Sequence, residues 1–94
     1  MSDSQASVSA ARGRTVTHQP AQQRFVARVG GSEAVLDYRR LAGGGIDFCH
    51  THVPEQLRGQ GVAEALVRAG LAWARGEGLH IQASCWYVQR FLRA

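Results

Sequence analysis

The sequence contains no lysine: all 11 of its basic side chains are arginine, against 7 acidic ones, which gives a net charge of +4 and a pI near 10.0. A surplus of this size attracts anionic ligands such as phosphates. The absence of lysine-rich blocks and the few aromatics outside expected core positions disfavour a nucleic-acid-binding protein. The absence of lysine also excludes a Walker phosphate loop, which requires that residue.

Cysteine is scarce as well, since Cys49 and Cys85 lie far apart and neither belongs to a CxxC pair. This spacing argues against a disulfide framework. No apolar run approaches the roughly 18 residues of a membrane span, and no secretory signal opens the chain. We therefore expect a soluble, cytoplasmic protein with reduced thiols and no membrane partner, either a monomer or a weak dimer.

The first 23 residues are rich in Ser, Ala, Gln and Thr and contain no aromatic side chain. A segment of this composition can bury little apolar surface, so residues 1–23 are expected to form a disordered or loosely attached tail. Residues 24–94 are long enough for one folded domain and too short for a second module.

Three segments with extended patterns come first in this domain. Residues 24–29 and 33–41 alternate polar and apolar side chains around Gly30 and Gly31, which is typical of a hairpin. Residues 46–53 carry β-branched and aromatic side chains and stop before a proline, which cannot continue a ladder. The sequence therefore predicts three successive strands.

In residues 61–75 the spacing of apolar side chains changes from every second residue to a period of about 3.6. This period predicts an amphipathic helix packed on a sheet. Residues 79–84 indicate a fourth strand, and residues 86–93 a short terminal helix. A right-handed crossover around the main helix places residues 79–84 parallel to residues 46–53. The expected fold is a single α/β domain with a mixed, twisted sheet of about four strands in the order β-β-β-α-β-α. Core packing in the terminal helix is expected from Trp86, Val88, Phe91 and Leu92.

Two glycines stand between the third strand and the main helix, in the run Gln56-x-x-Gly59-x-Gly61. Glycines there let several N–H groups point into one concavity at a helix N-terminus, which suits a phosphate. Arg58 adds a charged contact. A dinucleotide fingerprint is rejected because Glu64 stands where its third glycine belongs. The simpler alternative is a glycine turn that only starts a helix.

In its strand, loop and helix context, this run resembles the acetyl-CoA pyrophosphate loop of the GNAT N-acetyltransferase superfamily. The stretches HTHVPEQLRGQGVAEALVRAGLAWAR and LHIQASCWYVQRFL are similar to the small single-domain GNAT-related proteins. Those sequences run His-Thr-x-Val-Pro, then the glycine loop, then a cysteine after the last strand. The resemblance implies a compact fold that binds acetyl-CoA and transfers acetyl to an amine, on a small molecule or a protein. The implied cofactor contacts are Thr51, His52, Val53, Arg58, Gly59, Gln60, Gly61, Val62, Ala63 and Arg90.

Three side chains are candidates for the chemistry. His50 and His52 share one face of the expected strand, and a neutral imidazole suits a base near neutral pH. His50 is preferred because the family's His-Thr pair falls on it; alternatively, one histidine is a core residue and the other a surface residue. Cys85 precedes a helix, which can activate a thiol, so it is either an acetyl carrier, a wall of the thioester pocket or a small buried residue. Tyr87 could protonate the departing thiolate, as in larger GNAT enzymes, and Arg90 could meet a CoA phosphate.

Two further alternatives stay open. A zinc site of His50, His52 and Cys85 lacks a fourth ligand and any paired ligand motif, so we expect no metal. A non-catalytic module that holds CoA or a protein partner is favoured by the absence of an obvious glutamate base near the active strand. The nearest, Glu55, follows Pro54 in a loop.

Overall fold

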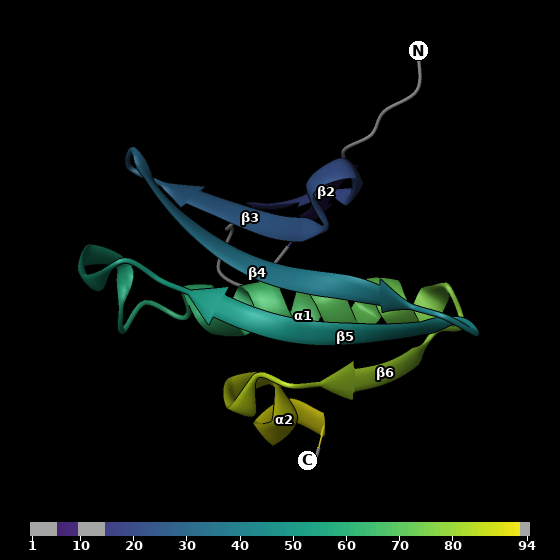
Figure 1. Ribbon diagram of the computed structural model, residues 1–94. Helices are drawn as coiled ribbons and strands as arrows, with labels where there is room; N and C mark the ends of the chain where they lie inside the picture. The colour runs from purple at the N-terminus through teal and green to yellow at the C-terminus, as the bar shows by residue number, and fades with distance from the viewer. Residues whose placement is uncertain (1–5, 10–14, 93–94) are drawn as a thin grey trace.

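The structure, a computed structural model, describes residues 6–9 and 15–92 (Figure 1). Six strands form one sheet in the order β1-β2-β3-β4-β5-β6, antiparallel except for the parallel pair β5 and β6. The elements are β1 (Ala6–Ser9), β2 (Thr15–Gln19), the 3-10 turn η2 (Pro20–Gln22), β3 (Arg24–Val29), β4 (Ser32–Leu41), β5 (Gly45–His52), the 3-10 turn η3 (Glu55–Leu57), α1 (Val62–Gly76), β6 (His80–Ala83) and α2 (Trp86–Leu92). From β3 onward this is the predicted order, with α1 as the crossover between parallel strands, so the expected α/β fold is confirmed.

The sheet begins before residue 24, which corrects the expected boundary of the folded domain. β2 pairs with β3, and its Val16 and His18 side chains are 0% and 6% exposed. Alternation turns these two side chains inward even though the segment is polar on average. The predicted tail is therefore wrong for residues 15–23, and the sheet has more strands than expected. β1 pairs with β2, and residues 1–5 and 10–14 of the predicted tail lie outside the described residues.

α1 covers one face of the sheet, behind β4 and β5 in Figure 1. A methyl group at Gly70 would lie 3.0 Å from Leu36 Cδ2 and 3.0 Å from Phe48 Cε1, so glycine at this position lets the helix approach the strands closely. The largest fully buried side chains are Phe25, Phe48, Leu36, Ile46, Leu66, Val16, Val26, Val62, Val67 and Val88. All of them except Val26 belong to the core cluster whose dense packing fixes α1 on the sheet.

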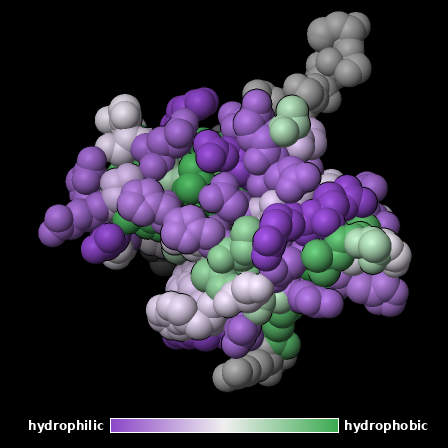
Figure 2. Space-filling view, in the orientation of Figure 1, coloured by the Kyte–Doolittle hydropathy of each residue, from purple (hydrophilic) through white to green (hydrophobic). Residues whose placement is uncertain are grey.

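The face of the sheet turned to the viewer in Figure 1 carries none of the described helices, and Figure 2 shows mainly hydrophilic residues on it. Ion pairs join neighbouring strands in this part of the structure: Arg24–Asp37 (3.5 Å), Arg28–Glu33 (2.9 Å) and Arg39–Asp47 (3.5 Å). The first two pairs are at least partly exposed, so they add little stability but keep the surface polar, whereas the carboxylate of the third is buried. We call this surface the open face. No helix in the described part of the chain has the length and apolar character needed to cross a membrane.

Candidate functional site

The glycine loop between β5 and α1 leaves the N-terminus of α1 open. Gly59 and Gly61 have φ angles of 81° and 78°, in the left-handed region that other residues rarely adopt. Gly61 is the N-cap of α1, and no side chain caps the helix there. The N–H groups of the first turn therefore have no intrahelical partner. A Cβ at Gly59 would meet nothing within 4 Å, so the loop borders open space. These features fit a phosphate group, which binds N–H groups at the positive end of a helix.

Side chains brace this loop from both sides. Arg58 Nε donates to the carbonyl of Val53 (3.0 Å), which holds the guanidinium near the end of β5. Gln56 Nε2 donates to Ser32 Oγ (2.9 Å) and ties the loop to the start of β4. Gln60 Nε2 donates to the carbonyl of Gln56 (3.1 Å). Gln60, a predicted cofactor contact, thus acts in the structure as a brace of the loop.

Three hollows surround the loop and the start of α2, and they are connected in the sense that neighbouring hollows share lining residues. The loop hollow, of about 270 Å³, is lined by Val53, Leu57, Arg58, Gly59, Gly61, Val62, Ala63, Glu64 and Tyr87. The strand-end hollow, of about 430 Å³, is lined by Thr51, His52, Val53, Arg58, Ala63, Cys85, Trp86 and Tyr87. The helix groove, of about 410 Å³, is lined by Glu64, Arg68, Tyr87, Arg90 and Phe91. The ring of Tyr87 borders all three, and most of the predicted cofactor contacts line one of them.

The strand-end hollow lies where β5 and β6 separate. Their parallel register ends at Phe48 opposite Ala83, whereas β5 continues to His52. Cys85 N–H still donates to the carbonyl of Phe48 (3.1 Å), and the chain then enters α2. The last four residues of β5 therefore have no partner on the β6 side. Divergence of parallel strands at their carboxyl ends is a favoured ligand position in α/β sheets.

A bulge in β5 decides which side chains face this hollow. The register with β4 shifts so that Cys49 has no partner, and beyond it Leu36 pairs with Thr51 and Asp37 with His50. Leu36 is buried against α1, whereas Asp37 forms an ion pair on the open face. Because paired residues share a face, Thr51 faces the α1 side and His50 the open face. Simple alternation of faces along this strand is therefore interrupted at Cys49.

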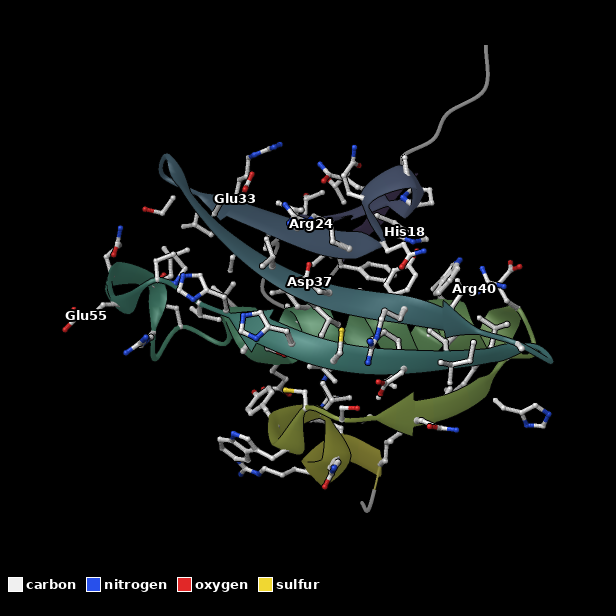
Figure 3. The ribbon with its side chains drawn as sticks, in the orientation of Figure 1. His18, Arg24, Glu33, Asp37, Arg40 and Glu55 are labelled. Atoms are coloured by element: carbon white, nitrogen blue, oxygen red, sulfur yellow. The ribbon has the colours of Figure 1, made fainter. Side chains whose placement is uncertain are left out.

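The bulge also separates the predicted base from the predicted nucleophile. His50 is exposed and lines none of the three hollows, whereas His52 lines the strand-end hollow together with Cys85. The zinc alternative loses its support, because residues 15–92 contain no group of three or more His, Cys, Asp or Glu side chains placed to hold a metal ion. Glu55 is exposed and points outward beyond the end of β5 (Figure 3).

The two cysteines occupy different environments. Cys85 is half-buried in the wall of the strand-end hollow, with Sγ 3.5 Å from Thr51 Oγ1. Cys49 donates its thiol to the carbonyl of Asp37 (3.6 Å), and burial raises the pKa of this thiol. A thiol with a raised pKa stays protonated at neutral pH and is a poor nucleophile. Of the two, Cys85 is the thiol that a ligand in the hollow would meet.

Tyr87 is protonated at neutral pH. Burial raises its pKa, and the carboxylate of Glu64 raises it further, while Arg90 and Arg68 partly offset both effects. Arg68 bonds the carboxylate of Glu64 at 2.8 Å, and the Arg90 guanidinium carbon lies 5.7 Å from the centre of the Tyr87 ring. A protonated phenol in the common wall of the three hollows can donate a proton to a group bound there.

The structure changes the predicted roles in the last helix. Val88 is fully buried as expected, but Trp86 is 68% exposed and Leu92 36%, so the prediction of core packing is wrong for these two. A helix of seven residues buries one narrow stripe, and Trp86 falls outside it at the rim of the strand-end hollow. Glu64 and Arg68 are exposed side chains of α1. They become walls of the site because α2 folds back beside them, which no local pattern reveals.

The fold and this site define an acetyltransferase-type domain. A sequence model of the family described as GCN5-related N-acetyl-transferase matches residues 24–94. The chain therefore belongs to this family, and the resemblance noted in the sequence is confirmed.

Relatives of the chain include Protein NATD1 from several vertebrates. The protein from Bos taurus is 35% identical over 80 residues, which cover 83% of this chain and 71% of the relative. The protein from Danio rerio is also 35% identical, over 83% of this chain and 73% of the relative. The protein from Homo sapiens is 34% identical, over 83% and 71%.

Proposed function

We propose that the chain binds acetyl-CoA in the three connected hollows and transfers the acetyl group to an amine. One observation carries the proposal: the uncapped N-terminus of α1 opens into a hollow that continues to the half-buried Cys85, where β5 leaves β6. A ligand with a pyrophosphate at one end and a thioester at the other fits this arrangement, with the pyrophosphate at the helix N-terminus and the thioester near Cys85. The N–H groups of residues 59–63 would hold the pyrophosphate, and the main chain of residues 51–53 would pair with the pantetheine.

Acetyl-CoA supplies an activated acyl group at the strand end. His50 stands on the open face beside the unpaired end of β5, where it can take a proton from an amine that arrives from that side, directly or through water. Main-chain N–H groups of the separating strands stabilise the oxyanion. Tyr87, which is protonated at neutral pH, gives its proton to the departing thiolate.

Cys85 offers a covalent variant of this route, in which its thiolate attacks the thioester carbonyl, the CoA thiolate leaves, and the acetyl group then passes from Cys85 to the amine. The support is its place in the wall of the strand-end hollow. Intact-mass measurement after exposure to acetyl-CoA should then show one acetyl adduct that Cys85→Ala removes and Cys49→Ala keeps. An adduct that persists in Cys85→Ala would exclude the covalent variant.

A non-catalytic CoA-binding module is the second candidate. It is favoured by the walls of the strand-end hollow, which include no carboxylate, and by the outward position of Glu55. Mass-spectrometric assays with peptide N-termini, lysine side chains and polyamines distinguish the two candidates. Acetyl-CoA binding without any acetylated product would favour the module.

Calorimetric titration with acetyl-CoA tests the first step of both candidates. Gly61→Asp should weaken binding at least about tenfold, because a carboxylate at the helix N-terminus repels the pyrophosphate. Gly43→Asp is the matched control, since Gly43 has the same φ of 78° but lies in the turn between β4 and β5. Equal affinities of the two variants would show that the glycine loop is not the site, and no heat with the unmodified protein at millimolar ligand would end the proposal.

A further inference from the structure

Asp47 is a buried carboxylate in an apolar part of β5. Asp47 stands between Ile46 and Phe48 in the sequence. It is 5% exposed, and both of its neighbours are 0% exposed. A charge removed from water in this way is costly unless several donors surround it. Its presence at this position therefore calls for a specific partner.

That partner is Ser84, which follows β6. Asp47 Oδ1 accepts the Ser84 N–H at 2.7 Å, and Oδ2 accepts the Ser84 hydroxyl at 2.7 Å. Arg39 Nη2 lies 3.5 Å from Oδ2 on the exposed side. Burial alone would raise the pKa of Asp47, but the bonds from Ser84 and Arg39 outweigh it and hold the pKa below its ordinary value. Both bonds to Ser84 are therefore charge-assisted at neutral pH.

The position of this contact coincides with the end of the parallel ladder. Pairing of β5 with β6 stops at Phe48 opposite Ala83, and the next N–H, that of Ser84, is taken by the Asp47 side chain. Cys85 then donates its N–H to the Phe48 carbonyl at 3.1 Å. The carboxylate takes the first N–H after β6, at the point where the chain turns toward α2.

We propose that Asp47 is a positioning residue of the candidate site. Through Ser84 it fixes where β5 and β6 separate, and thereby holds Cys85 and the first turn of α2 in the wall of the strand-end hollow. Asp47 itself lines none of the three hollows, so it acts through Ser84 and not on a ligand. The inference rests on the proposed function only in taking that hollow as the acetyl-CoA site.

The alkylation rate of Cys85 by iodoacetamide tests the positioning without acetyl-CoA. All variants carry Cys49→Ser, so a single thiol reacts. Asp47→Ala should raise the rate at least about tenfold, the factor expected when charge-assisted hydrogen bonds no longer hold the closed form. Asp47→Asn keeps an acceptor for the Ser84 N–H without the charge, and should stay within about threefold of the parent. Ser84→Ala, which keeps the N–H bond, should fall between the two.

Two controls separate positioning from charge and from general destabilisation. An equal rise in Asp47→Asn and Asp47→Ala would assign the effect to the lost charge and overturn the proposal. Arg39→Gln alters the surroundings of the same carboxylate from its exposed side, and should leave the rate within about twofold of the parent. If Asp47→Ala does not fold, Ser84→Ala decides: a rate more than about threefold above that of the parent supports partial release of the turn, and a rate equal to that of the parent contradicts the proposal.

A spectroscopic signature completes the test. In ¹⁵N-labelled protein the Ser84 amide proton should resonate downfield and shift with pH, with a midpoint below the ordinary Asp value of 3.8, and Asp47→Asn should abolish this titration. A Ser84 amide that does not respond would overturn the proposal. Calorimetry on the same variants then shows whether the affinity for acetyl-CoA changes together with the alkylation rate of Cys85. Failure of the unmodified protein to bind would sink the proposed function and leave the positioning result standing.

Discussion

The two ends of α1 are built in opposite ways. At the C-terminal end aromatic rings pack closely, since the ring of His18 stacks on Phe25 at 4.2 Å and lies 4.5 Å from the ring of Trp73. His18 Nε2 and the Tyr38 hydroxyl are 2.7 Å apart in a buried hydrogen bond. Figure 3 shows His18 and Arg40 on this side of the molecule. The buried polar side chains of His18 and Tyr38 thus satisfy each other within the protein.

At the N-terminal end, backbone and side chains are left open instead. A side chain at Gly59 would meet only open space, Gly61 lines the loop hollow, and Cys85 and Tyr87 are half-buried around the connected hollows. The 15 residues of α1 separate the two ends by roughly 22 Å. The contrast teaches that packing at one end anchors the helix, so that the other end can keep unpaired groups for a ligand.

The largest difference in stability between the two ends of α1 is expected when an aromatic ring is removed from each. Phe25→Ala should lower the free energy of unfolding by about 3–5 kcal/mol, because Phe25 is fully buried and its loss leaves a cavity. Trp86→Ala should change it by less than about 0.5 kcal/mol, because the indole is 68% exposed. Urea unfolding followed by circular dichroism measures both. A Trp86 effect as large as that of Phe25 would contradict the division of roles.

A single hydroxyl removed from each end gives the next largest effect. Tyr38→Phe should cost about 1–3 kcal/mol, because it leaves His18 Nε2 buried without its partner. Tyr87→Phe should cost less than about 0.5 kcal/mol in stability but lower the rate of acetyl transfer about a hundredfold, since the proton donor is lost. Unfolding curves and single-turnover rates of both variants provide the measurement. A normal rate in Tyr87→Phe would remove this tyrosine from the mechanism.

The fold could be predicted from the sequence wherever one face of an element is uniformly apolar. The period-two pattern of β3, β4 and β5 and the 3.6 period of α1 gave the order of elements from Arg24 onward. β2 was not predicted as a strand, because only the side chains of Val16 and His18 face inward and histidine is not counted as an apolar residue. Its place in the sheet follows from pairing with β3, a tertiary contact that composition does not reveal.

Local signals in the sequence led to residues that line the candidate site, whereas features that depend on long-range register were missed. Gly59, Gly61 and Cys85 carry local signals, and the structure places all three in the walls of the hollows. The bulge at Cys49 is invisible in one sequence, yet it turns His50 to the open face. A polar residue in an apolar strand was the available signal for Asp47, but its partner lies 37 positions further along the chain.

The pH dependence of stability tests the packed C-terminal end of α1 alone. Burial lowers the pKa of His18 below its ordinary 6.5, and nearby Glu77 only partly opposes this. Between the two pKa values the unfolded chain binds a proton that the folded chain does not, so stability is complete above about pH 6.5 and declines as the pH falls through the folded pKa. Unfolding free energies measured from pH 7.5 to 4.5 should show this decline, and His18→Gln should flatten it. His80→Gln, which alters an exposed histidine, should retain it. A flat profile in the parent protein would contradict a neutral, buried His18.

The smallest expected effect is a change in acetyl-CoA affinity at the N-terminal end of α1. It concerns Glu64, whose negative charge would repel the phosphates of the proposed ligand. Glu64 lines the loop hollow, although Arg68 holds its carboxylate at 2.8 Å. Glu64→Gln should raise acetyl-CoA affinity about two- to threefold at low salt, because a negative charge beside the pyrophosphate is removed. It should cost only about 0.3–0.5 kcal/mol of stability, since the pair is an exposed helical one.

Glu33→Gln is the control that ties this gain to the site, because Glu33 forms a similar exposed pair with Arg28 at 2.9 Å on the β3–β4 hairpin. It removes the same charge from the protein as a whole, so any gain shared by both variants comes from net charge and not from the loop hollow. A gain confined to Glu64→Gln that disappears at about 0.5 M salt would place the anionic end of the ligand beside the first turn of α1. Weaker binding in Glu64→Gln would instead mean that the carboxylate accepts a hydrogen bond from the ligand, and that the open end of the helix recognises more than a phosphate.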